Sequence, residues 1–200
     1  LTGAGKGFCS GADLSNGLLI ENKDKLEGWL KSFANPVIEY LQSMTTVIIA
    51  AVNGVAAGAG VSLALACDIA ISAASARYVF SFSKIGLAMD MGASWLLNRR
   101  LGMMRTAALT MSADFLDAEG ALKWGLVNEV IPDKQFMLRV EEFASLIASR
   151  PSQTLKVLKS QINYANSATL SEAMDYEAKL QGVLVKTNQA QTLIKDFARR

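Results

Sequence analysis

An apolar run that leads through a glycine-rich turn into a helix is the feature that most constrains this chain. The run reads VIIAAV over residues 47–52, and NGVAAGAG follows it over residues 53–60. An unbroken apolar run of this length is typical of a parallel strand covered on both faces. Because the first N–H groups of a helix lack partners within it, the helix expected over residues 59–67 would present free donors to an anionic oxygen.

A second glycine-containing segment, GFCSGAD at residues 7–13, precedes this run. Upstream of it, the residues Leu1-Thr2-Gly3 read as the end of a strand whose beginning is absent. We therefore expect the chain to be truncated at its N-terminus. Residues 14–25 are largely polar and contain glycine, which predicts a mobile loop.

The composition fits one compact α/β domain with a sizeable core, since 51% of the 200 residues are hydrophobic and 19% are charged. The net charge of +2 is too slight to indicate nucleic acid as a partner. No window holds about 18 uninterrupted apolar residues, so we expect a soluble protein with no membrane partner. The cysteines Cys9 and Cys67 lack CxxC spacing, which favours a reducing, cytoplasmic compartment over a metal site or a disulfide framework.

Predicted strands and helices alternate up to about residue 132, and the pattern after that is almost wholly helical. We therefore divide the chain into a core, residues 1–132, and a C-terminal helical region, residues 133–200. Asp117 is expected to cap one helix, and Thr169 with Glu172 fits a capping box at another. The remaining expected strands cover residues 68–73, 78–82 and 126–131, and the expected helices cover 26–44 with an interruption near Asn35-Pro36, 94–101, 104–111, 118–124, 134–149, 151–165 with Pro151 in its first turn, 170–186 and 188–200.

Several reaction classes are excluded by what the chain lacks. It contains no histidine, which removes Ser-His and Cys-His nucleophile pairs and most zinc chemistry. Acid–base work must then fall to carboxylates, lysine, tyrosine or water. The stretch Gly3–Gly7 lacks the ending of a phosphate loop, Gly58-Ala59-Gly60 lacks the third glycine of a dinucleotide fingerprint, and no Gly-x-Ser-x-Gly elbow occurs. Neither nucleotide binding nor serine hydrolysis is indicated.

Four short motifs occur in a characteristic order along the chain. They are GFCSGADL at residues 7–14, AVNGVAAGAG at 51–60, CDI at 67–69 and WGLVN at 124–128. In this order they resemble the enoyl-CoA hydratase/isomerase (crotonase) family, and the resemblance covers residue 1 to about residue 135. It implies an α/β, crotonase-like fold, which is a superhelix of repeated β-β-α units with a C-terminal helical trimerisation region.

The resemblance also implies a site that holds the thioester carbonyl of an acyl-CoA between two backbone N–H groups. By position these groups belong to Ala12 and Ala59, and the neighbouring Gly11, Gly58 and Gly60 are candidate substrate-binding residues. Donors that are fixed before the reaction stabilise a thioester enolate without a reorganisation cost. The alternative interpretation is that both glycine segments are merely tight turns that pack closely.

The reaction depends on side chains that vary within the family. Its hydratases carry two glutamates, and the aligned positions here hold Ser62 and Lys84, neither of which can replace a carboxylate base. Asp90 remains as the candidate catalytic base, in a loop that carries Met89 where the family usually has proline. In relatives whose only acid lies in this loop, the aspartate moves a proton between carbons of an unsaturated acyl-CoA, or serves the isomerisation of ring-epoxide CoA esters.

Other residues near Asp90 and near the first glycine segment are candidates for substrate binding. The apolar neighbours Met89, Met91 and Trp95 would raise the pKa of Asp90 and shape an acyl pocket. The other interpretation, in which Asp90 is a loop carboxylate or a helix cap, stays open. Lys6 is a candidate contact for the CoA phosphates, and a solvated lysine explains it equally well.

The residues together predict an acyl-CoA isomerase that converts 3-enoyl-CoA to 2-enoyl-CoA, or that acts on a related ring-epoxide CoA ester. The alternatives are an enoyl-CoA hydratase-like enzyme and a non-catalytic, acyl-CoA-binding protein of the same fold. Dehalogenases of the family use an aspartate in the same loop but need a histidine, which this chain lacks. The resemblance implies no cofactor beyond the CoA of the substrate, and a homotrimer or a dimer of trimers as the assembly.

Overall fold

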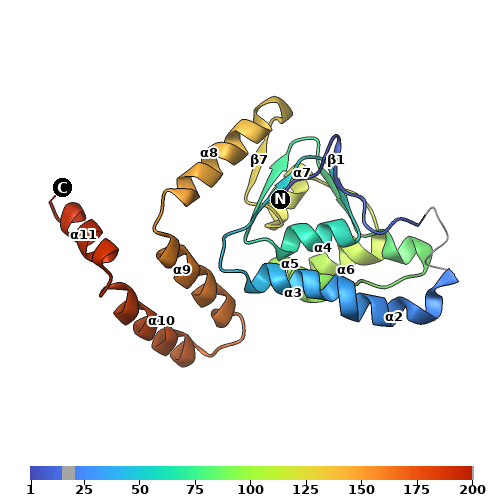
Figure 1. The fold of residues 1–200 in the computed structure, drawn as a ribbon. Helices are drawn as coiled ribbons and strands as arrows, with labels where there is room; N and C mark the ends of the chain where they lie inside the picture. Colours follow the sequence, from blue (N-terminus) through green and yellow to red (C-terminus); the bar gives the residue numbers. More distant parts are fainter. Residues whose placement is uncertain (15–20, 200) are drawn as a thin grey trace. The chain divides into compact units, whose positions relative to one another are not determined.

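The computed structural model describes residues 1–14 and 21–199 and forms two units (Figure 1). The larger unit comprises Leu1–Met44 and Ile48–Phe143, and the smaller unit comprises Thr45–Val47 and Ala144–Arg200. Part of the loop expected over residues 14–25 lies outside the described residues. Both glycine segments and Asp90 belong to the larger unit, which therefore contains the whole candidate site.

The apolar run supplies the first strand of a parallel, three-stranded sheet. Strand β2 (Ile49–Val52) pairs with β4 (Ile69–Ala73), and β4 pairs with β7 (Glu129–Ile131). The side chains of Val52 and Ile71 are fully buried. Burial on both faces is what the unbroken apolar sequence of β2 predicts.

A second sheet carries the strands that lead to the candidate site. Its order is β1 (Gly7–Cys9), β3 (Val55–Ala57), β5 (Arg77–Val79) and β6 (Leu116–Asp117). The first three strands are parallel, and β6 is antiparallel to β5. The carboxyl ends of β1 and β3 therefore lie at the same edge, where the two glycine turns follow.

The chain alternates between the two sheets and then enters a helix. It passes from β2 to β3 and into α4 (Ala59–Ala66), and from β4 to β5 and on to α5 (Ala93–Leu101). This repeat confirms the β-β-α architecture that the family resemblance implies. Helix α4 is buried on nearly all sides. Its largest buried side chain, Leu65, lies in the same hydrophobic core as Tyr78 and Phe80.

The other elements of the larger unit surround this core. Helix α3 packs against α4, and helix α6 packs against α5. The bounds are η1 Lys23–Lys25, α2 Leu26–Trp29, η2 Leu30–Ala34, α3 Asn35–Ser43, η3 Ser81–Ile85, α6 Met103–Ser112, α7 Ala118–Trp124, η4 Asp133–Gln135 and α8 Phe136–Ala148, the last of which continues into the smaller unit.

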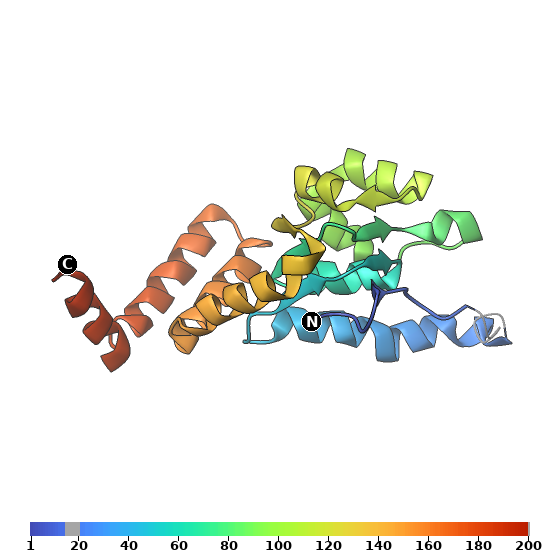
Figure 2. The same ribbon diagram turned by 90° about the horizontal axis from the view of Figure 1, so that it is seen from above.

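The smaller unit is helical and consists mainly of α9 (Ser152–Ala165), α10 (Leu170–Leu184) and α11 (Asn188–Phe197). Helices α9 and α10 lie side by side in Figure 2, and their tyrosines Tyr164 and Tyr176 meet with ring centroids 4.5 Å apart. Among the described residues, no helix of either unit is long and apolar enough to cross a membrane.

Two predicted helix caps are confirmed. The side chain of Asp117 accepts a hydrogen bond of 2.7 Å from the N–H of Gly120 at the start of α7. Thr169 and Glu172 form the reciprocal capping box at the start of α10. Both caps satisfy donors that a helix N-terminus leaves unpaired, so the local sequence alone fixes where these helices begin.

The interruption expected near Asn35-Pro36 is present as the π-helical turn η2, which ends at Ala34, directly before α3 begins at Asn35. Some other predicted boundaries are wrong. The strand expected over residues 78–82 ends at Val79, because β3 offers only three residues to pair with β5.

Two further boundaries shift for equally local reasons. The strand expected over residues 126–131 begins only at Glu129. Just before it, the side-chain oxygen of Asn128 accepts a hydrogen bond of 2.9 Å from the N–H of Ala70, in place of a backbone bond between strands. Pro151 lies at the N-cap of α9, one residue before its first helical turn.

Asn53, in the turn between β2 and β3, ties the first residues of the chain to both sheets. Its side-chain oxygen accepts a hydrogen bond of 3.0 Å from the N–H of Gly3, and its side-chain nitrogen donates to the carbonyls of Gly5 and Gly7 at 3.0 and 3.3 Å. The neighbouring Gly54 lies against the Lys6 carbonyl, where a Cβ would come within 2.0 Å of that oxygen. The turn thereby holds the strand that leads to the first glycine segment.

We expect Asn53→Ala to lower the free energy of unfolding by about 1–2 kcal/mol, since several backbone groups would lose their partner. Urea denaturation measures this change. The matched control is Asn98→Ala on the exposed side of α5, which should change stability far less. Equal effects of the two substitutions would contradict the role assigned to Asn53.

Candidate active site

The end of β1 and the start of α4 approach each other backbone to backbone. A Cβ placed on Gly60 would come within 2.3 Å of the Cys9 carbonyl oxygen, and one on Gly11 within 2.8 Å of the Ala57 oxygen. Gly11 also has a φ of +85°, which other residues rarely adopt. Neither glycine can carry a side chain without moving the backbone, so these two positions fix the approach of the two segments.

This approach brings the predicted N–H donors Ala12 and Ala59 to the same edge of the sheet. The Gly58 carbonyl accepts hydrogen bonds from the N–H groups of Val61 and Ser62 at 3.0 and 3.4 Å. The Ala59 N–H takes no part in these bonds of the first turn of α4. Of the hydrogen bonds between described residues, none is donated by the N–H of Ala12 or Ala59. The positive end of α4 adds to the attraction for an anionic oxygen at this place.

An aromatic ring borders the turn at Gly58. A Cβ on this glycine, whose φ is +50°, would lie 3.6 Å from Cζ of Phe82. The ring of Phe82 stacks on that of Phe80, with centroids 6.4 Å apart. The sequence did not single out Phe82, because a strand was expected to run to that position and the residue belongs instead to η3.

Asp90 carries a buried carboxylate oxygen. Its Oδ1 has no hydrogen-bond partner within the part of the chain that the structure describes. Burial raises the pKa of the Asp90 carboxyl above its ordinary value, and a hydrogen bond from its own backbone lowers the pKa in part. A carboxylate with one desolvated, unpaired oxygen is more basic than one in water and suits proton removal.

The loop that holds Asp90 is built around left-handed backbone. Met91 has a φ of +46°, which is uncommon for a residue with a side chain, and Gly92 has a φ of +72°. The Asp90 carbonyl accepts from the N–H of Ala93 at 3.0 Å and from Oγ of the buried Ser62 at 3.5 Å. Since Ser62 lies three residues after Ala59 on α4, this helix contacts both parts of the candidate site.

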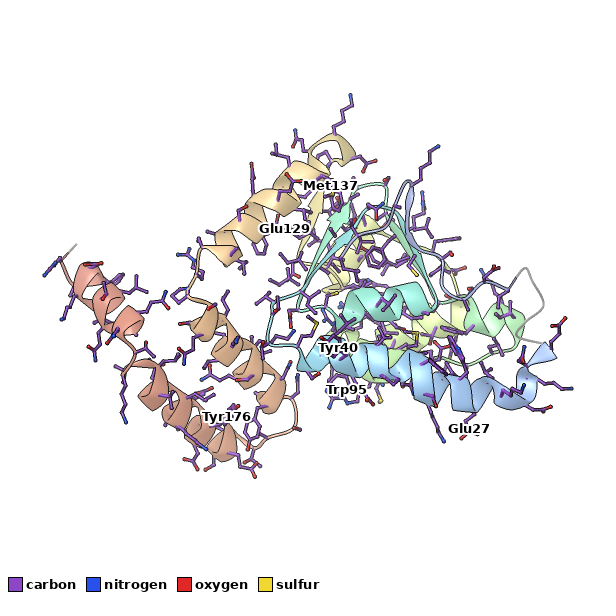
Figure 3. All side chains as sticks on the ribbon, viewed as in Figure 1. Glu27, Tyr40, Trp95, Glu129, Met137 and Tyr176 are labelled. Carbon is purple, nitrogen blue, oxygen red and sulfur yellow. The ribbon has the colours of Figure 1, made fainter. Side chains whose placement is uncertain are left out.

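The other predicted site residues differ in burial and in what they contact. Met89 is half-buried and packs against the core beside Asp90. Trp95 is 44% exposed on α5, and the Arg99 guanidinium lies 3.7 Å from its ring centroid. Figure 3 shows Trp95 on the side of the helices that faces away from the strands. Lys84 is exposed on η3.

Lys6 is exposed and lines a separate hollow of about 540 Å³. Asn53, Asp133 and Phe136 line the same hollow, which includes none of the residues around Asp90. Among residues 1–14 and 21–199, no group of three or more cysteine or carboxylate side chains is placed to hold a metal ion.

Comparisons with known proteins agree with the fold. Residues 1–200 match the family model described as enoyl-CoA hydratase/isomerase. The chain is 40% identical over 187 residues to the 1,2-epoxyphenylacetyl-CoA isomerase of Escherichia coli (strain K12), an alignment that covers 90% of this chain and 70% of that relative. It is 31% identical over 201 residues to the short-chain-enoyl-CoA hydratase of Clostridium acetobutylicum, which covers 98% of this chain and 75% of the relative.

A solved structure is similar along the whole chain. The enoyl-CoA hydratase from Bacillus anthracis has a TM-score of 0.93 at 28% identity, and the alignment covers 100% of this chain and 77% of that one. The fold thus defines a crotonase-type protein. The chain belongs to the enoyl-CoA hydratase/isomerase family, a family of enzymes that act on acyl-CoA.

The raised pKa of Asp90 predicts a dependence of stability on pH. Because folding disfavours the ionised carboxylate, its burial lowers stability once the pH rises through the folded-state pKa, and the penalty is absent below the unfolded-state pKa. We expect Asp90→Asn to unfold at a higher temperature than the wild type near neutral pH. The difference should vanish below about pH 4, near the pKa of an unfolded aspartate.

Thermal unfolding followed by circular dichroism across this pH range checks the expectation. Asp114→Asn, which changes an exposed aspartate after α6, serves as the control. An Asp90→Asn variant that is less stable than the wild type at neutral pH would contradict the assignment of Asp90 as a carboxylate with a desolvated, unpaired oxygen.

Proposed function

We propose that the protein is an acyl-CoA isomerase that moves a double bond from the 3- to the 2-position of an enoyl-CoA, or that rearranges a ring-epoxide CoA ester. The buried, unpaired oxygen of Asp90 is the observation that carries this proposal. It offers a single base whose pKa is already raised, in contact with the helix that begins at Ala59. The relative from Escherichia coli, named as an isomerase, supports the same reaction class.

The first role in this mechanism falls to backbone donors. The N–H groups of Ala12 and Ala59 would hold the thioester oxygen as negative charge develops on it. Both groups are free among the described residues, and the start of α4 supplies a favourable dipole. Removal of one such donor typically costs about 3 kcal/mol of transition-state stabilisation. Gly11, Gly58 and Gly60 would serve by letting the substrate and the backbone approach closely.

The second role falls to Asp90. Its carboxylate would take a proton from the carbon next to the thioester carbonyl and form a dienolate, whose oxygen the two donors stabilise. The resulting carboxylic acid would return the proton two carbons away, and the double bond would shift toward the thioester. No water is consumed, and the carboxylate is regenerated.

Hydration is the competing reaction, because the relative from Clostridium acetobutylicum is named as a hydratase. The positions of the family's two hydratase glutamates hold Ser62, whose hydroxyl is buried against the Asp90 carbonyl, and Lys84, which is exposed. Neither group provides a carboxylate to activate water. This pair of residues favours isomerisation over hydration.

The surroundings of the site support a ring-containing acyl group among the substrates. The Phe82 ring lies against the turn at Gly58, directly before the proposed donor Ala59. Met89 would complete an apolar wall beside Asp90. Trp95 would contact the acyl group only through the ring face that the Arg99 guanidinium does not cover.

The remaining expectations concern CoA and the assembly. We propose that CoA is bound as part of the substrate with no separate cofactor, and that Lys6 meets its phosphates. We also propose a homotrimer or a dimer of trimers. The smaller unit exposes large apolar side chains such as Ile162, Leu170 and Phe197, which suit burial against further copies of the chain.

The test of the reaction is conversion of 3-hexenoyl-CoA to 2-hexenoyl-CoA, with hydration of 2-hexenoyl-CoA followed in parallel. We expect isomerisation without hydration in the wild type. Asp90→Asn should lower kcat by about 10²-fold or more, because a positioned general base typically contributes that much. Because the pKa of Asp90 is raised, kcat/KM should begin to fall with decreasing pH above the range of an ordinary aspartate.

Asp114→Asn is the matched control and should retain full activity. Hydration that exceeds isomerisation would replace the proposed function with the hydratase alternative. Tight binding of the CoA ester without turnover, in the wild type and in both variants, would indicate a non-catalytic acyl-CoA-binding protein.

A further inference from the structure

We propose that Arg100 is a positioning residue, which clamps α5 to α4 and thereby holds the Asp90 loop at a fixed place relative to the start of α4. This inference rests on the proposed function for its effect on catalysis. The clamp itself is a matter of structure and can be tested without turnover.

The contact that carries the inference lies at the C-terminal end of α4. Nη2 of Arg100 donates to the carbonyl of Leu65 at 2.6 Å and to that of Cys67 at 3.0 Å. The last carbonyls of a helix have no partner within it and form its negative end, so a guanidinium is well suited to bind them. Arg100 therefore connects the last turn of α5 to the last turn of α4.

The guanidinium is also partly withdrawn from water. Burial lowers the pKa of Arg100 from its ordinary value, and the nearby Cys67 and Asp68 raise it. An arginine gives up hydration in this way only where fixed acceptors replace the water. Two carbonyls of one helix end, held at hydrogen-bond distance, supply that replacement.

The N-terminal ends of the same two helices carry the candidate site. Helix α4 begins at Ala59, and α5 begins at Ala93, directly after the loop of Asp90 and Met91. Ser62 also touches the Asp90 carbonyl, but its distance of 3.5 Å is at the long limit of a hydrogen bond. That contact is too weak to fix the loop, and the clamp at the opposite helix ends provides the stronger constraint.

Such a constraint matters because proton transfer between carbons needs a base at a defined place. A displacement of about 1 Å at the reacting groups can cost about 10²-fold in rate. A shift of α5 along α4 would move Asp90 relative to the Ala59 N–H while leaving both groups chemically intact. Loss of the clamp should therefore lower kcat more than it weakens binding of the CoA ester.

The experiment compares Arg100→Met with Arg105→Met. Arg105 is exposed, and it donates to the carbonyl of Trp124 at the end of α7, a helix that carries no candidate residue. The two variants therefore remove the same kind of interaction from different helices. Arg100→Lys keeps the charge but not the planar fork, and it serves as the conservative variant.

The first readout is amide hydrogen exchange in residues 86–93, where the Ala93 N–H bonds to the Asp90 carbonyl. We expect at least tenfold faster exchange of this segment in Arg100→Met and no change in Arg105→Met. The second readout is isomerase kinetics. We expect kcat to fall at least tenfold and KM to change less than threefold in Arg100→Met, with an intermediate kcat for Arg100→Lys.

The outcomes separate this inference from the proposed function. Unchanged exchange in residues 86–93 of a folded Arg100→Met variant would overturn the inference whatever the activity. If Arg100→Met does not fold, the same readout on Arg100→Lys decides in the same way. Faster exchange together with a wild type that shows no isomerisation would uphold the clamp and refute the proposed function.

Discussion

The close approach of two backbone segments is the constraint on which the candidate site depends. Gly60 lies against the Cys9 carbonyl and Gly11 against the Ala57 carbonyl, at distances that leave no room for a side chain. The four-stranded sheet makes this approach possible, because β1 and β3 are parallel neighbours in it and end at the same edge. The turns that follow bring the Ala12 and Ala59 N–H groups there, and the first turn of α4 contacts the Asp90 loop through Ser62.

The site is held in place at a local cost in stability. Asp90 keeps an oxygen buried without a partner among the described residues, and Met91 adopts a left-handed conformation that costs of order 1–3 kcal/mol. The buried core that includes Leu65, Tyr78 and Phe80 offsets this cost and packs around α4. Active sites commonly carry such a loss of stability, because a reactive group must be kept without the hydrogen bonds that water would give it.

The sequence predicted the parts of the fold that local pattern determines. The run VIIAAV predicted a buried strand because its residues are apolar on both faces, and Asp117, Thr169 and Glu172 predicted helix starts because a cap acts within four residues. The glycine segments predict backbone donors, and the missing histidine leaves acid–base work to carboxylates, lysine, tyrosine or water; the family resemblance then points to the Asp90 loop. Asp90 could be proposed as the base from its type and place in the motif.

The rest depends on contacts between elements far apart in the chain. The burial of the Asp90 oxygen, the Phe82 ring against Gly58 and the Arg100 clamp all join separate elements and leave no periodic signal. The early end of β5 likewise follows from the length of its partner β3. Such features follow from the packing of the whole unit and cannot be read from a single stretch of sequence.

A crystal structure of the Asp90→Asn variant with 3-hexenoyl-CoA bound would show directly whether the backbone donors and Asp90 hold the substrate. We expect the thioester oxygen within hydrogen-bond distance of the N–H groups of Ala12 and Ala59, with the side chain at position 90 beside the carbon next to the carbonyl. A thioester bound elsewhere, such as in the hollow that Lys6 lines, or an oxygen that meets neither N–H group, would contradict it.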